Sequence, residues 1–333
     1  MSHPTFPAPL LPMTFSQILD RTYRLTRAYL RSFLAIALIP AAAFVVFMVA
    51  MEAAIFVPLI RQFPNPPSPE GMNHLLRPAI ILPWILLFII FHGVVFALYF
   101  AAAIHAATQA DRGRAVPFRE AYRVAWANAG RYLLLMLLIY AIAFLPALVI
   151  ELAGFGGAAL LSLENANTNP AVFLLIPLAM LLFLAAFVYA TIMGLRLSLA
   201  FPACVAEGLP ARAALRRSSH LTLGAKGRIF LVLLVVYAIL YVLVMVVEFV
   251  LVIFAAIGIL AVSVLQVHLS TPLSYVAMGV AILLLAALFL LYIALTWAVM
   301  TTTLAVLYHD QCLRQDFPPP TPIQPPLPPG APA

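Results

Sequence analysis

This sequence is poor in charged residues: Asp, Glu, Lys and Arg make up 9% of its 333 residues, whereas a soluble domain carries roughly 25%. Its residues are 65% hydrophobic, and its mean hydropathy is +1.10. A water-soluble fold cannot cover that much apolar surface, so we expect lipid to be the solvent for most of the chain. Cysteine is also scarce. Cys204 and Cys312 lie near the basic ends of apolar runs, which indicates reduced thiols rather than a disulfide.

The sequence also lacks the motifs of common enzyme classes. Gly154, Gly156 and Gly157 lie in an apolar context with no following Lys, so they do not form a phosphate-binding loop. There is no zinc-protease helix, no nucleophile elbow and no pair of carboxylates on a soluble segment. His105 and His309 have no neighbours at the spacing of a metal site. We therefore predict that the protein is not an enzyme and has no catalytic residue, cofactor or bound metal.

The two ends of the chain are rich in proline. The first twelve residues contain four prolines and neither Lys nor Arg, so they do not begin like a secretory signal peptide, and we expect no processing. Segments 1–13 and 318–333 are expected to be disordered, because proline-rich chain cannot pack a core. Between them, residues 14–317 form the predicted membrane domain.

Long apolar runs fill that domain. Most exceed the roughly 20 residues that a helix needs to cross a bilayer, so we expect them to tilt, bend at prolines or protrude. Six spans are predicted, at about 32–60, 79–107, 132–152, 171–201, 229–262 and 275–308.

Positive charge is distributed unevenly around these spans. Sixteen of the eighteen Lys and Arg residues fall on one side of the predicted membrane, the exceptions being Arg61 and Arg77. Because positively charged loops stay in the cytoplasm, this asymmetry predicts that both termini are cytoplasmic. The formal net charge of +7 could also suggest nucleic acid, but the basic residues flank apolar spans. Anionic lipid headgroups are therefore the expected partner, and no nucleic acid is expected.

Three basic amphipathic helices are predicted on that side, at 15–31, at 117–130 and from Pro210 to about Gly224. Apolar side chains recur along one face of each and arginines along another, as in helices that lie at a membrane surface. Thr14 and Gln17 have the spacing of a capping box. The candidate headgroup ligands are Arg24, Arg27, Arg31, Arg119, Arg123, Arg131, Arg212, Arg216, Arg217 and Arg228.

The order of basic helix, span, outer loop and returning span recurs three times, at about 14–107, 117–206 and 209–308. A repeat of this length indicates duplicated supersecondary units. All three units run in the same direction, so an axis along the membrane normal would relate them, not an inversion. We predict an all-α integral membrane protein whose six transmembrane helices form three repeats of an interfacial helix followed by a transmembrane hairpin.

Each unit also carries one glutamate, about 20 residues after the arginine that closes its basic helix. These are Glu52, Glu151 and Glu248. About 20 residues of helix span about 30 Å, the thickness of the hydrocarbon layer, so the three carboxylates would lie at equivalent depths near the outer ends of their spans. They form either a ring that binds cations or substrate amines, or three separate contacts with headgroups.

Three further polar residues fall inside or at the end of apolar runs. His92 lies near the middle of the second span, where it either satisfies a backbone carbonyl or relays protons. Arg196 lies six residues before Pro202 and either snorkels to the inner headgroups or pairs inside the bundle. Asp310, at the end of the sixth span, is expected to cap or pair with a basic interfacial helix.

Three passages carry a family resemblance. They are FSQILDRTYRL at Phe15–Leu25, RLSLAFPACVAEGLPARAALRRSSHLT at Arg196–Thr222 and TLAVLYHDQCLRQD at Thr303–Asp316. Together they resemble the glycerophosphoryl diester phosphodiesterase membrane-domain family, over about residues 14–317. The resemblance implies a six-span protein of a bacterial cytoplasmic (inner) membrane. The soluble phosphodiesterase barrel that some members carry is absent here, so the resemblance implies no hydrolase activity and transfers no catalytic residue.

Two functions of different classes follow. The first is a non-enzymatic membrane module that engages anionic lipids and a partner protein, as the arginines beside each inner span end indicate. The second is a transporter or channel for a small solute or lipid-derived molecule. In that case Glu52, Glu151, Glu248, Arg196 and His92 would line its path.

Overall fold

The computed structural model of the chain describes residues 11–60, 78–150, 171–268 and 271–316. Within these ranges every regular element is a helix, and six helices are long and apolar enough to cross a membrane. The prediction of an all-α membrane protein with six spans is therefore confirmed. The predicted disordered tail at 318–333, and most of the predicted disordered N-terminus, lie outside the described residues.

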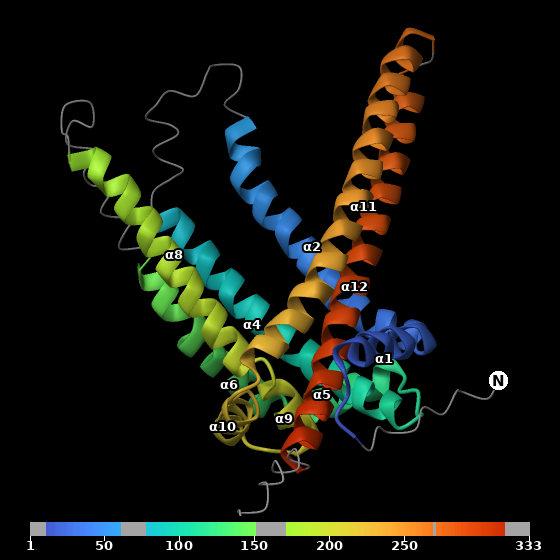
Figure 1. The fold of residues 1–333 in the computed structure, drawn as a ribbon. Coiled ribbons are helices and arrows are strands. Elements are labelled where there is room, and N and C mark those ends of the chain that lie inside the picture. The colour runs from blue at the N-terminus through green and yellow to red at the C-terminus, as the bar shows by residue number, and fades with distance from the viewer. Residues whose placement is uncertain (1–10, 61–77, 151–170, 269–270, 317–333) are drawn as a thin grey trace, which may run out of the picture.

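The spans meet at one end and diverge away from it into separate groups (Figure 1). Contacts lead from each span to the next, and the last span returns to the first. The last two helices are longer at both ends than the apolar runs indicate. The spans are α2 (Leu30–Ile60), α4 (Pro78–Asp111), α6 (Ala129–Ile139) with its continuation η1 (Tyr140–Phe144), α8 (Ala171–Leu197), α11 (Lys226–His268) and α12 (Thr271–Asp316).

Four short helices gather at one end of the bundle, which we call the basic end (Figure 1). They are α1 (Phe15–Ala28), α5 (Phe118–Ala127), α9 (Ala200–Ala206) and α10 (Ala211–Leu221). The predicted capping box is confirmed: the Thr14 side chain accepts from Gln17 N–H, and the Gln17 side chain accepts from Thr14 N–H at 2.7 Å. The arrangement in three repeats stays a prediction.

The short helices end earlier than their sequence pattern indicates. The chain breaks at Tyr29 after α1 and at Asn128 after α5, and α10 ends at Leu221. The arginines expected to close the three helices therefore stand in the first turns of the following spans. These residues are Arg31, Arg131 and Arg228.

The third span changes its hydrogen bonding at η1, where the Leu145 N–H bonds to the Tyr140 carbonyl five residues earlier. Pro146 explains the change, because it has no N–H for the carbonyl of Ile142 four residues before it. That carbonyl instead accepts the Tyr189 hydroxyl of α8 at 2.9 Å. The proline and the tyrosine together fix this wide turn against the neighbouring span.

Helix α8 ends at Leu197, whereas the sequence indicates a fourth span that continues to about 201. The chain then turns and starts α9, whose residues Ala200–Cys204 are all buried. Pro202 lies in the first turn of α9, where a helix leaves N–H groups unpaired anyway. Arg196 consequently lies in the last turn of α8, where its carbonyl accepts the Ser218 hydroxyl of α10 at 2.8 Å.

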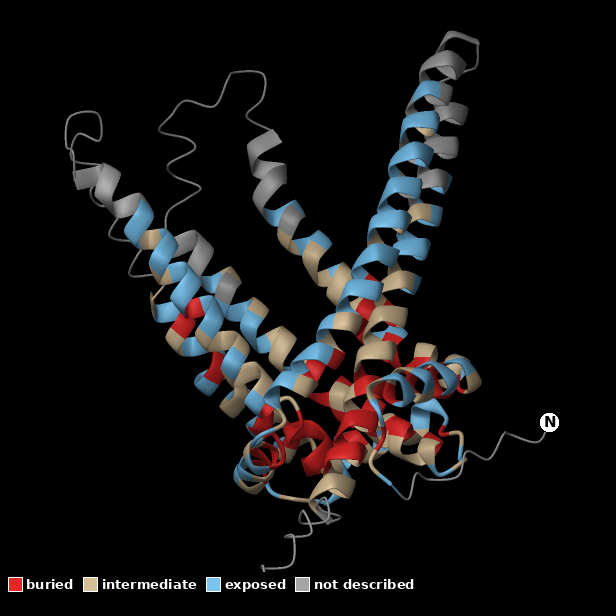
Figure 2. Cartoon of the chain, viewed as in Figure 1, coloured by how far each residue is buried: buried red, intermediate tan, exposed pale blue. Residues whose placement is uncertain are grey.

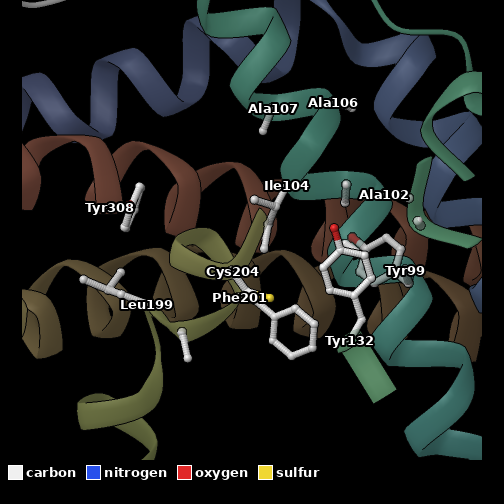
Figure 3. Packing of buried hydrophobic residues seen from close by; sticks show 14 of the residues in the cluster. Tyr99, Ala102, Ile104, Ala106, Ala107, Tyr132, Leu199, Phe201, Cys204 and Tyr308 are labelled. Carbon is white, nitrogen blue, oxygen red and sulfur yellow. The ribbon is translucent and has the colours of Figure 1, made fainter. Parts of the chain in front are cut away.

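Most of the buried side chains lie at the basic end (Figure 2). Helix α4 is central, with contacts to α1, α2, α5, α6, α9 and α12. Its buried face is rich in alanine, including Ala102 and Ala106, which lets neighbouring backbones approach closely. Figure 3 shows Tyr99 of α4, Tyr132 of α6 and Phe201 of α9 in the same packed region. Further out the spans are largely exposed, as expected of surfaces that face lipid.

The carboxylate of Asp310 joins both ends of the described chain. It is fully buried, and it lies 3.0 Å from Arg228 Nη1 of α11 and 3.0 Å from Arg314 Nε of α12. It also accepts the Met13 N–H at 2.7 Å, while the Met13 carbonyl accepts from Arg228 at 2.5 Å and from Arg314 at 2.7 Å. Met13, which the sequence placed in a disordered segment, is therefore fixed against α11 and α12.

We predict that Asp310→Asn lowers the thermal stability of the detergent-solubilised protein markedly. The change leaves two guanidinium groups without their buried anion, and breaking a buried pair costs about 3–5 kcal/mol. The matched control is Asp20→Asn, which breaks an exposed pair with Arg24 and should cost less than about 1 kcal/mol. Equal melting temperatures for the two variants would contradict the role assigned to Asp310.

Candidate functional site

The basic end presents three amphipathic helices whose apolar faces are used by the protein itself. The buried side chains are Ile18, Thr22, Leu25 and Thr26 of α1, Ala121 and Ala125 of α5, and Ala211, Ala214, Leu215, Ser218 and Leu221 of α10. These residues pack against the spans, while Phe118 and Trp126 of α5 stay exposed. Their polar faces carry the arginines predicted to bind headgroups.

Five of the predicted headgroup ligands are exposed and form no ion pair or side-chain hydrogen bond with any described residue. They are Arg27, Arg31, Arg123, Arg212 and Arg216. Two others have weak local contacts: Arg24 pairs with Asp20 at 2.9 Å, and the Arg119 guanidinium lies 5.8 Å from the centre of the Phe118 ring. The exposed arginines give this end a surface of positive charge that the described part of the chain leaves uncompensated.

The three remaining predicted ligands bind protein groups instead. Arg131 donates to the Gly208 carbonyl at 2.9 Å, and Arg228 belongs to the Asp310 cluster. Arg217 pairs with Glu207 at 3.0 Å. Burial alone would lower the pKa of Arg217, but the hydrogen bond and charge of Glu207 outweigh it and raise that pKa. These arginines connect elements of the fold and have fewer donors left for a headgroup.

An open groove of about 610 Å³ lies along α5. It is lined by Ile39, Phe118, Arg119, Tyr122, Arg123, Trp126 and Ala127. Trp126 is 68% exposed, which suits the water–lipid interface, where tryptophan is enriched. The Tyr122 hydroxyl donates to the Ile36 carbonyl of α2 at 2.9 Å, and burial raises the pKa of Tyr122 above its ordinary value. This hydroxyl therefore stays neutral and holds α5 against α2.

A second groove, of about 490 Å³, lies between α8, α10 and η1. Its lining is Ile142, Met193, Arg196, Leu197, Leu215, Arg216, Ser219, His220 and Leu223. The Nε of Arg196 donates to the Ser219 hydroxyl at 3.2 Å. Arg196 was predicted either to reach the inner headgroups or to pair inside the bundle. The structure places its side chain at a helix end, beside a surface groove.

His92 and Tyr140 form a polar pair within the spans. The imidazole Nδ1 of His92 bonds to the Tyr140 hydroxyl, so its partner is a side chain and not a backbone carbonyl. The His92 ring stacks on the Phe96 ring, with ring centroids 4.0 Å apart. The centroids of the Phe96 ring and of Trp297 on α12 lie 4.7 Å apart. The pair thus lies in an aromatic cluster that joins α4, η1 and α12. The position of Tyr140, 48 residues from His92, gives no signal in the sequence.

The three predicted glutamates are not brought together by the described residues. Glu248 is exposed on α11. Glu151 and the side chain of Glu52 are not among the parts of the chain that the structure describes. The ring of carboxylates therefore stays a prediction.

A more enclosed cavity of about 350 Å³ lies at the basic end between α1, α4, α9 and α12. Its polar lining includes Thr108, Asp111, Arg112, Thr302 and His309. The Nε2 atom of His309 is buried and has no hydrogen-bond partner among the described residues. Sequence reasoning did not find this cavity, because its walls come from four helices that are distant in sequence. Within the described ranges no cluster of His, Cys, Asp and Glu could hold a metal ion.

No family model, curated protein or solved structure matches this chain. What the basic end does is therefore inferred from its own geometry.

We predict that Tyr140→Phe destabilises the protein by about 0.5–1.5 kcal/mol, the net contribution of a typical hydrogen bond, because the His92–Tyr140 pair is half-buried. The phenyl ring keeps the packing on Phe144 but cannot bond to His92. Thermal melting in detergent measures the effect, with the exposed Tyr237→Phe on α11 as the control. A Tyr140 variant as stable as the control would show that the hydrogen bond contributes nothing.

Proposed function

We propose that this chain is a non-enzymatic membrane module whose basic end binds the headgroups of anionic phospholipids. The observation that carries the proposal is the set of exposed arginines on α1, α2, α5 and α10 that have no acidic partner among the described residues. Each guanidinium near an anionic membrane surface contributes about 1 kcal/mol of attraction. Five such groups at one end of a six-span bundle favour an anionic leaflet strongly.

The same arrangement supports the predicted orientation. With six spans both ends of the described chain lie at the basic end, where Met13 contacts α12. Clusters of arginine beside span ends favour the cytoplasmic side. We therefore propose that the basic end faces the cytoplasm of a bacterium. The likeness to the glycerophosphoryl diester phosphodiesterase membrane-domain family agrees with this proposal and remains part of it.

The test is the lipid composition around the intact protein. The full chain is reconstituted in a bilayer of phosphatidylglycerol and phosphatidylcholine, extracted with a polymer that keeps the surrounding lipid, and analysed by mass spectrometry. Phosphatidylglycerol should be enriched over the bulk mixture. The variant with Gln at Arg27, Arg31, Arg123, Arg212 and Arg216 should lose most of that enrichment.

The control is Arg24→Gln, because Arg24 already has an acidic partner in Asp20. This variant should keep the enrichment of the wild type. Equal recovery of the two lipids with the unmodified chain would overturn the proposed function.

A second function, solute transport, is favoured by the enclosed cavity between α1, α4, α9 and α12. Its volume of about 350 Å³ is within the range of small-molecule sites. The polar side chains of its lining, among them Thr108, Asp111 and Arg112, offer hydrogen-bond partners to a small polar solute.

Filling the cavity tests this second function. Ala305→Phe places a large side chain in the lining and should abolish any flux of amino acids or organic acids into proteoliposomes. Leu288→Phe on an exposed face of α12 is the control and should leave flux unchanged. Absence of flux for the unmodified chain across the panel would remove transport as a candidate.

A further inference from the structure

The groove between α8, α10 and η1 differs from the general basic surface because it combines two arginines with an apolar lining that continues onto the spans. The guanidinium groups of Arg196 and Arg216 come from the end of α8 and from α10, at the basic end. Ile142 of η1 and Met193 of α8 belong to the membrane spans. A phospholipid has the same polarity sequence, with a phosphate at the surface and acyl chains toward the bilayer centre.

Arg196 is held in place by α10. Its Nε donates to the Ser219 hydroxyl at 3.2 Å, and its carbonyl accepts the Ser218 hydroxyl at 2.8 Å. The two terminal nitrogens form no hydrogen bond with the described residues. A guanidinium whose orientation is already fixed loses less entropy when its free donors bind a phosphate.

The position of Arg196 also suits a cation. It lies in the last turn of α8, where the helix dipole is negative. Arg216 is exposed and has no partner among the described residues. No acidic side chain is among the residues that line the groove. The site therefore keeps the charge of two guanidinium groups, which the negative end of the α8 dipole offsets only in part.

A chain of hydrogen bonds fixes the tautomer of His220. Arg217 donates to Gln315 Oε1 at 3.1 Å, so the amide nitrogen of Gln315 faces His220 and donates to its Nδ1 at 3.1 Å. With Nδ1 accepting, the neutral imidazole carries its proton on Nε2. His220 lines the groove, so its imidazole stands beside the two guanidinium groups.

We infer that this groove binds one anionic phospholipid. Its phosphate is held by Arg196, Arg216 and His220, and an acyl chain lies along Ile142, Met193 and Leu197. This site deepens the proposed function, since it would be one defined position on a surface that attracts anionic lipid generally. The α5 groove lacks the equivalent fixation, because neither Arg119 nor Arg123 forms a side-chain hydrogen bond with a described residue.

The experiment titrates the purified full chain in detergent with dioleoyl phosphatidylglycerol and follows bound lipid by native mass spectrometry. The double variant Arg196→Gln, Arg216→Gln removes two charges from the groove. The matched control, Arg114→Gln with Lys226→Gln, removes two charges from exposed positions that lie outside the groove and are not among the proposed headgroup ligands. The affinity of the first bound lipid should fall about tenfold or more in the groove variant, since each charge-assisted bond contributes substantially. It should fall less than about twofold in the control.

The possible outcomes separate this site from the proposed function. Equal weakening by both double variants would overturn the groove while leaving a general anionic surface. If dioleoyl phosphatidylcholine binds the unmodified chain as tightly as phosphatidylglycerol does, both ideas fail. If the groove variant misfolds, as thermal melting would show, Arg216→Gln alone replaces it, because Arg216 has no contact that its loss could disturb. That single variant should still weaken the first site, and an unchanged affinity would overturn the assignment.

The acyl chain is tested by competition. Inorganic phosphate has the charge of the headgroup but no apolar part. At millimolar concentration it should leave the first phosphatidylglycerol bound. Full displacement by inorganic phosphate would show that the groove recognises a free anion and would overturn its assignment to a phospholipid.

Discussion

The buried carboxylate of Asp310 needs positive partners, because a charge removed from water is costly unless it is paired and hydrogen-bonded. The fold supplies them from three places: Arg228 at the start of α11, Arg314 at the end of α12 and the backbone N–H of Met13 ahead of α1. No two of these segments could shift apart without exposing an ion to an apolar interior. The cluster therefore fixes where the basic end closes, and the packing of α1 on α2, α4 and α12 follows from it.

The packing of the basic end separates the arginines into two sets: those that bind protein groups and those that are exposed. Arg131, Arg217 and Arg228 bind carbonyl or carboxylate groups of the protein, so they set the positions of α9, α10 and α11. The exposed arginines lie on α1, α2, α5 and α10 and have no acidic partner among the described residues, and the proposed lipid role depends on this charge. The arginines that bind protein groups thus hold in place the helices that carry the exposed arginines. A surface helix alone would have to bury its apolar face in lipid and could not keep its arginines at fixed positions.

The helical class and the six spans were predictable because lipid imposes them: any long apolar run must satisfy its backbone internally. The capping box at Thr14 was predictable because it is local. The break after Leu197 was not, although Pro202 was noticed, because the helix ends where Ser218 of α10 takes over the Arg196 carbonyl. The pairing of His92 with Tyr140 depends in the same way on how α4 meets η1. The amphipathic pattern indicates which arginines lie on the polar face of a helix. Only the packing of the helices decides which of these arginines already bind protein groups.

The helix break after Leu197 has the largest consequence for function. Had α8 continued to about residue 201, Arg196 would lie inside the span and would need a partner in the bundle, which favours a solute path. Because the helix ends at Leu197, Arg196 stands at the basic end beside α10, and its fixed Nε leaves two donors free. The same break lets α9 fold inward and fill the centre of that end with buried residues, among them Phe201 and Cys204 (Figure 3). A single local event therefore closes the interior and places Arg196 beside the groove between α8, α10 and η1, as the proposed lipid site requires.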